Sequence, residues 1–447
     1  MGAVRVLPDL PFGWRWESLG DVASWSSGGT PKSRTPHFYG GHIPWAVIGD
    51  LNDGVVTHTV ATITSAGLAA SSAKIVPAGT VLVAMYGSIG KLGIAGMEMA
   101  TNQAIACARP MPSVDPRYLF YWLLGQRPTL LAAGKGGTQA NISQSILKPW
   151  PIPVPPLEEQ RRIVAILDDH LSRLDAADSL TALATRRLVA FVASGVDAAV
   201  RSVPFVDQHL SDVVNRIEAG RSFGSSNRPA LDSEWGIVKV SAMTWGEFRE
   251  TENKAVRDES KVDPRFEIRS GDILVSRANT TAYVGAPVMV GHVRPRLLLS
   301  DKSLRLIPAA GIDPRWLHAV LQAPASRRQM SALATGTKDS MRNLSQANLL
   351  SVSVPVPSGS DQAVVVQRVR AVTEAADRLN AEIEATRDRT KALRRSLLDA
   401  AFTGRLTGSA VTDALLDLAA TESFSVFPPS TQAPPTPTPT TEDASHD

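Results

Sequence analysis

The sequence has a single cysteine, Cys107, among 447 residues. One thiol excludes a disulfide framework within the chain and a zinc site built from several cysteines, and it fits a reducing cytoplasm. No apolar run approaches the roughly 18 residues that a membrane span requires, and the first residues carry no secretory apolar core. Because 447 residues exceed one typical domain, we expect a cytoplasmic protein of at least two domains.

Motifs of common enzyme chemistry are missing as well. Residues 87–92 (GSIGKL) resemble a phosphate loop only superficially, because Leu92 stands where a magnesium-binding Ser or Thr is required. The eight histidines form no pair at metal-ligand spacing. No convincing Ser-His-Asp or Cys-His arrangement is visible. The sequence therefore favours a binding protein over an enzyme, with no catalytic residue and no metal site.

Charge is unevenly distributed along the chain. The formal net charge is +3, but no Lys or Arg follows Arg405, and six acidic residues lie beyond Gly408. Without those six acids, 46 basic residues face 37 acidic ones, a net charge of +9 for the rest. This balance is compatible with a nucleic-acid partner and equally with a mildly basic cytosolic protein.

Two long stretches carry the heptad pattern of a coiled coil. Apolar or small residues recur at alternating steps of about four and three from Ile163 to Phe191, and again from Val365 to Leu397. The second series follows the first at a constant offset of roughly 202 residues, which indicates a tandem repeat. Ordinary core packing or self-dimerisation is the alternative explanation. The candidate seam residues are Ile163, Leu167, Leu174, Leu188, Val365, Val369, Leu379, Ile383, Leu393 and Leu397.

The segments ahead of the two helices repeat the same order of motifs. Residues 19–22 (LGDV), 79–83 (GTVLV) and 114–119 (VDPRYL) recur as 210–213 (LSDV), 271–275 (GDILV) and 312–317 (IDPRWL). Short apolar runs at 43–48 and 80–84 predict strands, and Asp115-Pro116 predicts a helix start. The predicted organisation is a first globular domain at 1–155, a long helix at 156–202, a second globular domain at 203–357, a long helix at 358–408, and an acidic Pro/Thr-rich tail at 409–447 that we expect to be disordered.

Over about residues 8–407 the chain resembles the specificity (S) subunits of type I restriction-modification systems. The stretches that carry the resemblance are 10–14 (LPFGW), 28–31 (GGTP), 101–105 (TNQAI), 153–164 (PVPPLEEQRRIV), 393–398 (LRRSLL) and 401–406 (AFTGRL). In the second repeat 219–222 (AGRS) stands near the place of GGTP, and Asp301-Lys302 replaces Asn102-Gln103.

The resemblance implies an α+β fold, in which two globular mixed α/β target recognition domains are separated by two long helices pairing as an antiparallel coiled coil. Each domain would read one half of a bipartite site in double-stranded DNA. Two DNA-adenine methyltransferase (M) subunits would dock on this frame, and restriction/translocase (R) subunits would join them. S-adenosylmethionine would bind the methyltransferase subunits, so no cofactor is expected on this chain.

Base reading requires Arg, Lys, Asn or Gln at loop tips, because these side chains make bidentate contacts with base edges. A plain solvent-exposed role is the alternative for each candidate. The candidate DNA-binding residues are Lys32, Arg34, Tyr86, Ser88, Lys91, Lys135 and Gln139 in the first domain, and Arg221, Asn227, Arg228, Arg277, Asn279, Lys338 and Arg342 in the second.

Charged positions beside the seams are candidates for methyltransferase docking, with a solvated helix face as the alternative. These positions are Arg161, Arg173, Arg378 and Arg387. Two other readings of the whole chain remain open. One is a coiled-coil scaffold for protein partners that binds no DNA, and the other is an enzyme with a cryptic nuclease or methylase site. Only a specificity subunit would form a methyltransferase complex that modifies a bipartite site.

Overall fold

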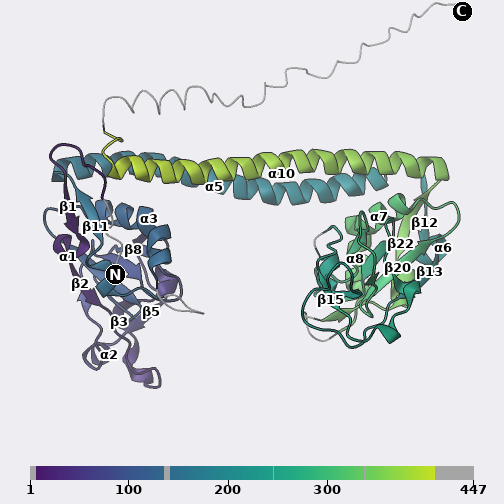
Figure 1. The fold of residues 1–447 in the computed structure, drawn as a ribbon, viewed down its shortest axis with the longest axis horizontal. Coiled ribbons are helices and arrows are strands. Elements are labelled where there is room, and N and C mark those ends of the chain that lie inside the picture. Colours follow the sequence, from purple (N-terminus) through teal and green to yellow (C-terminus); the bar gives the residue numbers. More distant parts are fainter. Residues whose placement is uncertain (1–6, 135–140, 245, 337–338, 340, 408–447) are drawn as a thin grey trace, which may run out of the picture. The chain divides into compact units, whose positions relative to one another are not determined.

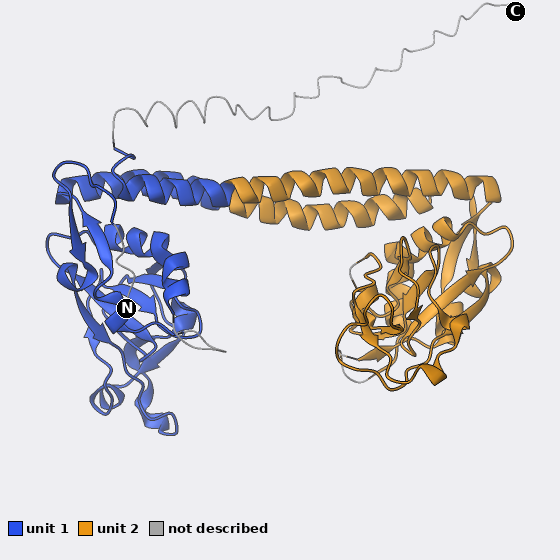
Figure 2. Cartoon of the chain, in the orientation of Figure 1, with its two compact units in different colours: residues 1–176, 390–447 blue, residues 177–389 orange. Residues whose placement is uncertain are grey.

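The computed structural model describes residues 7–134, 141–244, 246–336, 339 and 341–407. The predicted tail at 409–447 and the candidates Lys135, Gln139 and Lys338 lie outside these residues. The chain divides into two compact units (Figure 2), Met1–Ala176 with Thr390–Asp447, and Ala177–Arg389. No helix among the described residues combines the length and apolarity that crossing a membrane requires.

Unit 1 is built on two small sheets (Figure 1). The first has the order β2-β10-β7-β8-β4, and the second has the order β5-β3-β9-β6. Strand β1 (Arg15–Ser18) pairs with β11 (Pro151–Val154), which ties the N-terminal part of the unit to the Pro-rich residues 151–156. The sheet strands are β2 (Ala23–Ser27), β3 (Tyr39–Ala46), β4 (Gly54–Val56), β5 (Ala61–Ile63), β6 (Ile75–Val76), β7 (Val81–Ala84), β8 (Leu92–Ala95), β9 (Met99–Thr101) and β10 (Ile105–Pro110).

Unit 2 repeats this plan with one strand fewer in each of the two sheets. Its main sheet has the order β13-β20-β16-β18, and a second sheet has the order β15-β14-β19. Two further pairs are β12 (Phe205–His209) with β22 (Ser353–Pro357), and β17 (Ala278–Asn279) with β21 (Arg342–Asn343). The sheet strands are β13 (Val214–Ala219), β14 (Gly236–Val238), β15 (Asn253–Ala255), β16 (Ile273–Ser276), β18 (Pro287–Met289), β19 (Leu297–Leu298) and β20 (Ser303–Pro308).

The repeat extends to the register of the strands. In unit 1, Cys107 on β10 lies between Leu82 of β7 and Ser26 of β2. In unit 2, Arg305 on β20 lies between Leu274 of β16 and Glu218 of β13. Since residues 79–83 and 271–275 are matched in sequence, Cys107 and Arg305 occupy equivalent positions.

In each unit, the helix that packs against the main sheet begins at the same sequence signal, an Asp followed by a Pro. Asp115 and Asp313 accept hydrogen bonds from the first turns of α3 (Pro116–Ala133) and α7 (Pro314–Gln322), and a proline fills the first helical position, as predicted. A short helix α8 (Pro324–Leu333) continues beyond α7 in unit 2. The remaining short helices are α1 (Leu19–Val22), α2 (Ser65–Ala69), α4 (Gln144–Leu147), α6 (Leu210–Val213) and α9 (Gln346–Leu350).

A buried glutamine in each repeat joins these caps to the long helices. The amide of Gln160, fully buried in α5 (Leu157–Val200), accepts from the Asp115 N–H at 2.9 Å and donates to two backbone carbonyls. Gln362, in α10 (Gly359–Phe402), accepts from the Asp313 N–H at 2.7 Å. These bonds fix the start of each long helix against its own globular domain.

The two long helices pack against each other within both units, as predicted. In unit 1, Ile163 and Leu167 share a core cluster with Leu397 and Phe402. In unit 2, the end of α5 around Val200 shares a core with Val365 and Val369 at the start of α10. The beginning of one helix therefore meets the end of the other, which makes the pair antiparallel.

The predicted seam is buried only in part. Ile163, Leu167 and Val365 are fully buried because a globular domain also covers them. Leu174, Leu188 and Ile383 are half-buried. Leu379 and Leu393 keep 45% and 44% of their surface exposed and belong to no core cluster, although Leu379 lines a groove between the two helices together with Leu188 and Ile383. Two paired helices alone shield only a narrow stripe along their contact.

Candidate nucleic-acid interface

Three loops meet at one edge of unit 1, which we call the first recognition edge: residues 28–34, 86–91 and 102–104. The Gly29 N–H donates to the Thr101 carbonyl at 2.9 Å, and the Thr30 hydroxyl donates to Gln103. The Met85 N–H donates to the Ala104 carbonyl at 2.8 Å. The three loops are therefore fastened together next to the ends of β2 and β7.

The loop at 28–34 presents two cations from a rigid base. A Cβ atom on Gly28 would collide with the carbonyl oxygens of Thr101 and Asn102, so only glycine fits this close approach. The Trp45 indole donates to the Gly29 carbonyl at 3.0 Å. Lys32 and Arg34 are exposed beyond these anchors, so both are free to meet an anion.

The loop at 86–91 exposes an aromatic side chain beside polar groups. Tyr86 keeps 42% of its surface exposed, and Ser88 is also exposed. Lys91 is half-buried, with its ammonium donating to the Ile48 carbonyl at 3.3 Å. Arg127 of α3 holds the loop by donating to the Gly90 carbonyl at 2.7 Å.

Unit 2 builds an equivalent second recognition edge from residues 220–224, 277–285 and 300–302. The Arg277 N–H donates to the Lys302 carbonyl at 2.8 Å, as Met85 does to Ala104. Gly220 lies against the Leu299 carbonyl, as Gly28 lies against that of Thr101. The Ser222 hydroxyl donates to Asp301, as Thr30 does to Gln103.

This geometry corrects the sequence alignment of the two repeats by one residue. Strand register pairs Ile105 with Ala84 and Ser303 with Ser276, so Asp301 is the counterpart of Gln103 rather than of Asn102. The two edges therefore share main-chain anchors, such as the Met85–Ala104 and Arg277–Lys302 bonds, while many of the side chains they carry differ.

The structure brings three of the second set of candidates onto this edge. Arg221 is exposed, with its guanidinium 6.0 Å from the centre of the Phe266 ring. Arg277 is half-buried and donates weakly to the Asp301 carbonyl at 3.4 Å. Asn279, on β17, is half-buried, and its side-chain oxygen accepts from the Thr280 N–H. These three residues give the second edge polar and cationic side chains at positions that differ from those on the first edge.

Two other candidates are occupied within their own loops. Both terminal nitrogens of Arg228 donate to Glu234 at 2.6 Å, and this pairing, with the Leu231 N–H, lowers the pKa of Glu234 to about 2. Arg342 donates to the carbonyls of Gly336 and Ala334, so it closes its own turn. Their geometry favours loop structure over base reading, because the terminal nitrogens of both side chains already have acceptors. Asn227 is exposed next to Arg228.

Sequence reasoning missed several exposed residues on the two edges. Gln103 and Lys302 lie in the turns that join β9 to β10 and β19 to β20. Tyr283 keeps 41% of its surface exposed, in the loop equivalent to that of Tyr86. Gly90 and Gly285, both with positive φ near 70°, donate to the carbonyls of matched strand ends. In the sequence, an alignment of Gly90 with Gly285 would have matched the two loops and so pointed to Tyr283 as a second exposed aromatic residue.

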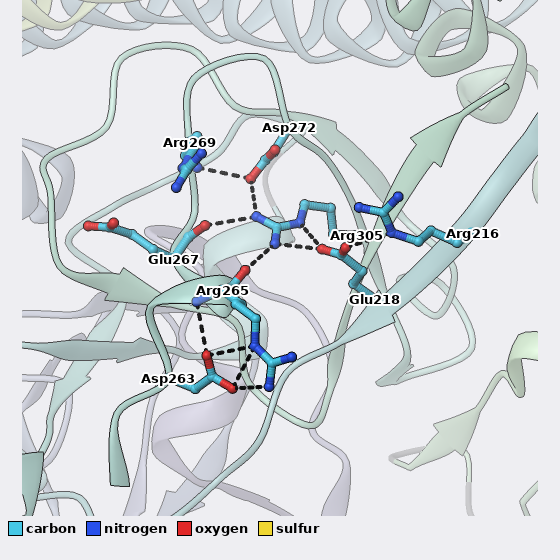
Figure 3. A network of polar contacts seen from close by, with 8 residues as sticks. All are labelled: Arg216, Glu218, Asp263, Arg265, Glu267, Arg269, Asp272 and Arg305. Atoms are coloured by element: carbon cyan, nitrogen blue, oxygen red, sulfur yellow. Dashed lines mark hydrogen bonds and ion pairs between the residues drawn. The ribbon is translucent and has the colours of Figure 1, made fainter. Parts of the chain in front are cut away.

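A buried arginine organises the side of unit 2 next to the second edge (Figure 3). Arg305 is only 6% exposed, and it donates to Glu218, Asp272 and the carbonyls of Arg265 and Glu267. Burial alone would lower its pKa, but the two carboxylates reverse this effect and raise the pKa of Arg305. Burial would likewise raise the pKa of Glu218, but hydrogen bonds from Arg305 and Arg216 hold that pKa below its usual value.

The candidate docking arginines lie along the helices with mostly local partners. Arg161 and Arg173 pair with Glu158 and Asp169 on their own helix, and Arg378 is exposed. Arg387 pairs with Glu384 and also donates to the Thr185 hydroxyl of α5 at 2.9 Å, so it ties the two helices together within unit 2.

An apolar groove runs between α5 and α10 within unit 2, and sequence reasoning did not single it out. Its volume is about 480 Å³. Leu180, Phe191 and Leu379 on its wall keep 66%, 42% and 45% of their surface exposed. Large apolar side chains grouped in a groove usually mark a protein-binding surface. The remaining wall residues are Thr181, Leu183, Ala184, Arg187, Leu188, Glu382, Ile383 and Thr386.

Among the residues that the structure describes, no group of three or more His, Cys, Asp or Glu side chains is placed to hold a metal ion. Cys107 is buried, and burial raises the pKa of its thiol despite hydrogen bonds to Thr101 and Ser26. Cys107 is therefore a packed core residue rather than a reactive thiolate.

Comparison with known proteins agrees with this architecture. Residues 11–181 match the family model described as "Type I restriction modification DNA specificity domain". The chain is 28% identical over 195 residues to the specificity subunit of the EcoEI type I restriction enzyme of Escherichia coli, covering 43% of this chain and 33% of that subunit. It is 22% identical over 422 residues to the EcoKI specificity subunit of E. coli K12, covering 89% and 90% of the two chains.

Solved structures share the fold. A chain from a structure on complex assembly in a type I restriction-modification system superposes with a TM-score of 0.71 at 20% identity, over 90% of this chain and all of that one. The HsdS subunit of Thermoanaerobacter tengcongensis gives a TM-score of 0.51 at 20% identity, over 89% and 99% of the two chains.

Two equivalent loop edges on repeated sheets, with long helices shared by both units, form an architecture that this chain has in common with the HsdS subunit. Residues 11–181 match the DNA specificity domain of type I restriction-modification systems, and over most of its length the chain is similar to specificity subunits of that family. The chain spans about a third of the length of the EcoEI subunit that it matches.

Proposed function

We propose that this chain is the DNA-specificity subunit of a type I restriction-modification complex and that its two units read the two halves of a bipartite DNA target. The observation that carries this proposal is the repeated recognition edge, in which matched main-chain bonds hold unlike side chains. A shared anchor with different side chains suits two readers of one kind that select different base pairs.

The first edge offers Lys32, Arg34 and Gln103 for base or phosphate contacts, with Tyr86 beside them. The second edge offers Arg221, Arg277 and Lys302. Arginine and lysine contact guanine edges in the major groove, whereas contacts to phosphates add affinity without sequence information. Because these side chains differ, we expect the two half-sites to differ in sequence.

The helix pair has two roles in this proposal. First, two antiparallel helices define the span between the readers far better than a flexible linker, so they set the length of the unread spacer. Second, the apolar groove near Leu180 and Leu379 receives an apolar helix of a DNA-adenine methyltransferase subunit. The methyltransferase supplies the S-adenosylmethionine site and the chemistry, and restriction subunits join the assembled complex.

Co-expression with a DNA-adenine methyltransferase tests the proposal directly. We expect methylated adenines in a bipartite motif when host DNA is sequenced with base-modification detection, and none when either chain is expressed alone. A stable complex that leaves DNA unmodified and unbound would instead support a protein scaffold. Methylation without the methyltransferase would reveal an enzyme.

The spacer role has its own test. Removing one heptad from each long helix at matched positions should change the spacer length of the methylated motif while both half-sites stay the same. A control that replaces one heptad with another of equal length should leave the spacer unchanged. An unaltered spacer in the shortened variant would refute the ruler role without touching the assignment of the readers.

A further inference from the structure

In the Arg305 network, the acidic side chains that bind Arg305 face inward and the surrounding arginines face outward (Figure 3). The carboxylates of Asp272 and Glu218 face inward, with side chains 16% and 22% exposed, and both bind Arg305. The arginines around them face outward, with the side chain of Arg265 82% exposed and that of Arg216 60% exposed. A buried cation thus neutralises the acids, and the exposed cations remain available to an external anion.

Arg265 is held ready for such an anion. Its Nε and Nη2 donate to the Asp263 carboxylate at 3.1 and 2.7 Å, which fixes the plane of the guanidinium. Its Nη1 has no partner among the described residues. A guanidinium with one edge hydrogen-bonded to a carboxylate and the other edge free can donate to a phosphate while it keeps its existing hydrogen bonds.

The loop that carries Arg265 adjoins the second recognition edge. Phe266, the next residue, lies under the guanidinium of Arg221, and its carbonyl accepts from the Leu299 N–H at 3.0 Å. Arg305 fixes the same loop from beneath, through the carbonyls of Arg265 and Glu267 at 2.6 and 2.8 Å. One buried side chain therefore sets where Arg265 projects.

We propose that Arg265 contacts a DNA phosphate beside the second half-site and that Arg305 is the positioning residue that aims it. This inference rests on the proposed DNA-reading function and adds to it a phosphate contact outside the predicted residues. The contact supplies affinity and register rather than sequence selection.

The first unit lacks this device. The counterpart of Arg305 is Cys107, whose strand partner is Ser26 in the place of Glu218, and Thr80 occupies the position of Asp272. An uncharged set at the same three positions packs a sheet of the same register. The three residues of unit 1 can therefore replace the charged network of unit 2 with uncharged side chains that this fold accommodates.

Salt-dependent binding of the full chain to a fluorescent random-sequence duplex measures the phosphate contact. Each phosphate contact contributes about 0.9 to the slope of log affinity against log salt. We expect Arg265→Ala to reduce the slope by about that amount, whereas Arg370→Ala, which removes an exposed carboxylate-paired arginine from α10, leaves it unchanged. An unchanged slope for Arg265→Ala would overturn the proposal.

A double-mutant cycle isolates the positioning role. The combined Glu218→Ser, Asp272→Thr, Arg305→Cys variant copies the neutral set of unit 1 and should lose the same slope as Arg265→Ala. Adding Arg265→Ala to it should have no further effect, because an unaimed arginine makes no contact to lose. Additive losses would show that Arg305 does not act through Arg265.

Two further measurements keep the result unambiguous. Arg305→Lys retains the charge but not the forked donors, so we expect it to lose the slope contribution while circular dichroism still shows a folded chain at the temperature of the binding assay. A full slope in a folded Arg305→Lys variant would contradict the positioning role. Wild-type chain that shows no salt-dependent binding to any duplex would overturn the proposed function itself, and this inference with it.

Discussion

Removing the apolar wall of the helix groove should abolish most of the affinity for the methyltransferase. Leu180, Phe191 and Leu379 line this groove with 66%, 42% and 45% of their surface exposed. Complete burial of such a side chain contributes about 2 kcal/mol. Scaled by the exposed fractions, docking gains about 1.3, 0.8 and 0.9 kcal/mol from them, or about 3 kcal/mol together.

Serine at all three positions should therefore weaken the complex by about two orders of magnitude in Kd. Because the side chains are already largely exposed, the free energy of unfolding of the isolated chain should change by less than about 1 kcal/mol. Isothermal titration of purified methyltransferase into the chain measures the affinity, and thermal unfolding checks the fold.

Val189 provides the matched control. It is 69% exposed on the same helix α5 but lies outside the groove. Val189→Ser should bind the methyltransferase like the wild type. If the triple variant keeps its affinity within about threefold, or if Val189→Ser loses as much, the groove is not the docking surface.

Three further predictions concern stability and base reading. Burial lowers the pKa of His318 from 6.5 to about 4. As the pH falls, the unfolded chain therefore takes up a proton before the folded chain does. The free energy of unfolding, measured by denaturant titration, should fall by about 2 kcal/mol between pH 7 and pH 5 in the wild type but not in His318→Leu. Gln160→Leu leaves the Asp115 N–H and the carbonyls of Ser113 and Pro155 without their partner. The free energy of unfolding of unit 1 should therefore drop by about 2–4 kcal/mol in a thermal unfolding experiment, while the surface change Arg161→Ala has little effect. Arg34→Ala should weaken DNA binding by about 1–3 kcal/mol if Arg34 reads a base, and this loss of affinity should be confined to duplexes that carry the first half-site. An equal loss of affinity on all duplexes would instead assign Arg34 to a phosphate contact.

The long helices and the start of α3 and α7 were accessible from sequence because their signals are local. A heptad pattern needs only spacing along one chain, and an Asp-Pro pair marks a helix start wherever it occurs. The fold class followed from these signals together with the family resemblance. The extent of burial along the seam could not be predicted from the sequence, because the exposure of Leu379 depends on whether another part of the protein covers the helix pair at that position.

The candidate interface was predicted less completely, for a different reason. Loop position identified Lys32, Arg34 and Arg277, but it gave no information on whether a donor is already occupied, as in Arg228 and Arg342. The Arg305 network joins residues 87 and 33 positions apart in sequence. Only strand register brings them together, and no local pattern records that register.

The way in which the recognition loops are fastened has a consequence for how new specificities arise. Their anchors are largely main-chain groups, as in the Met85–Ala104 and Arg277–Lys302 bonds, and a main-chain group is supplied by any residue. Side chains between the anchors can change, and inserts of different length can be accommodated, without a compensating change in the sheet beneath. Under the proposed function, such a subunit would exchange its target by replacing a few loop residues, and one repeat would diversify while the other kept its half of the site.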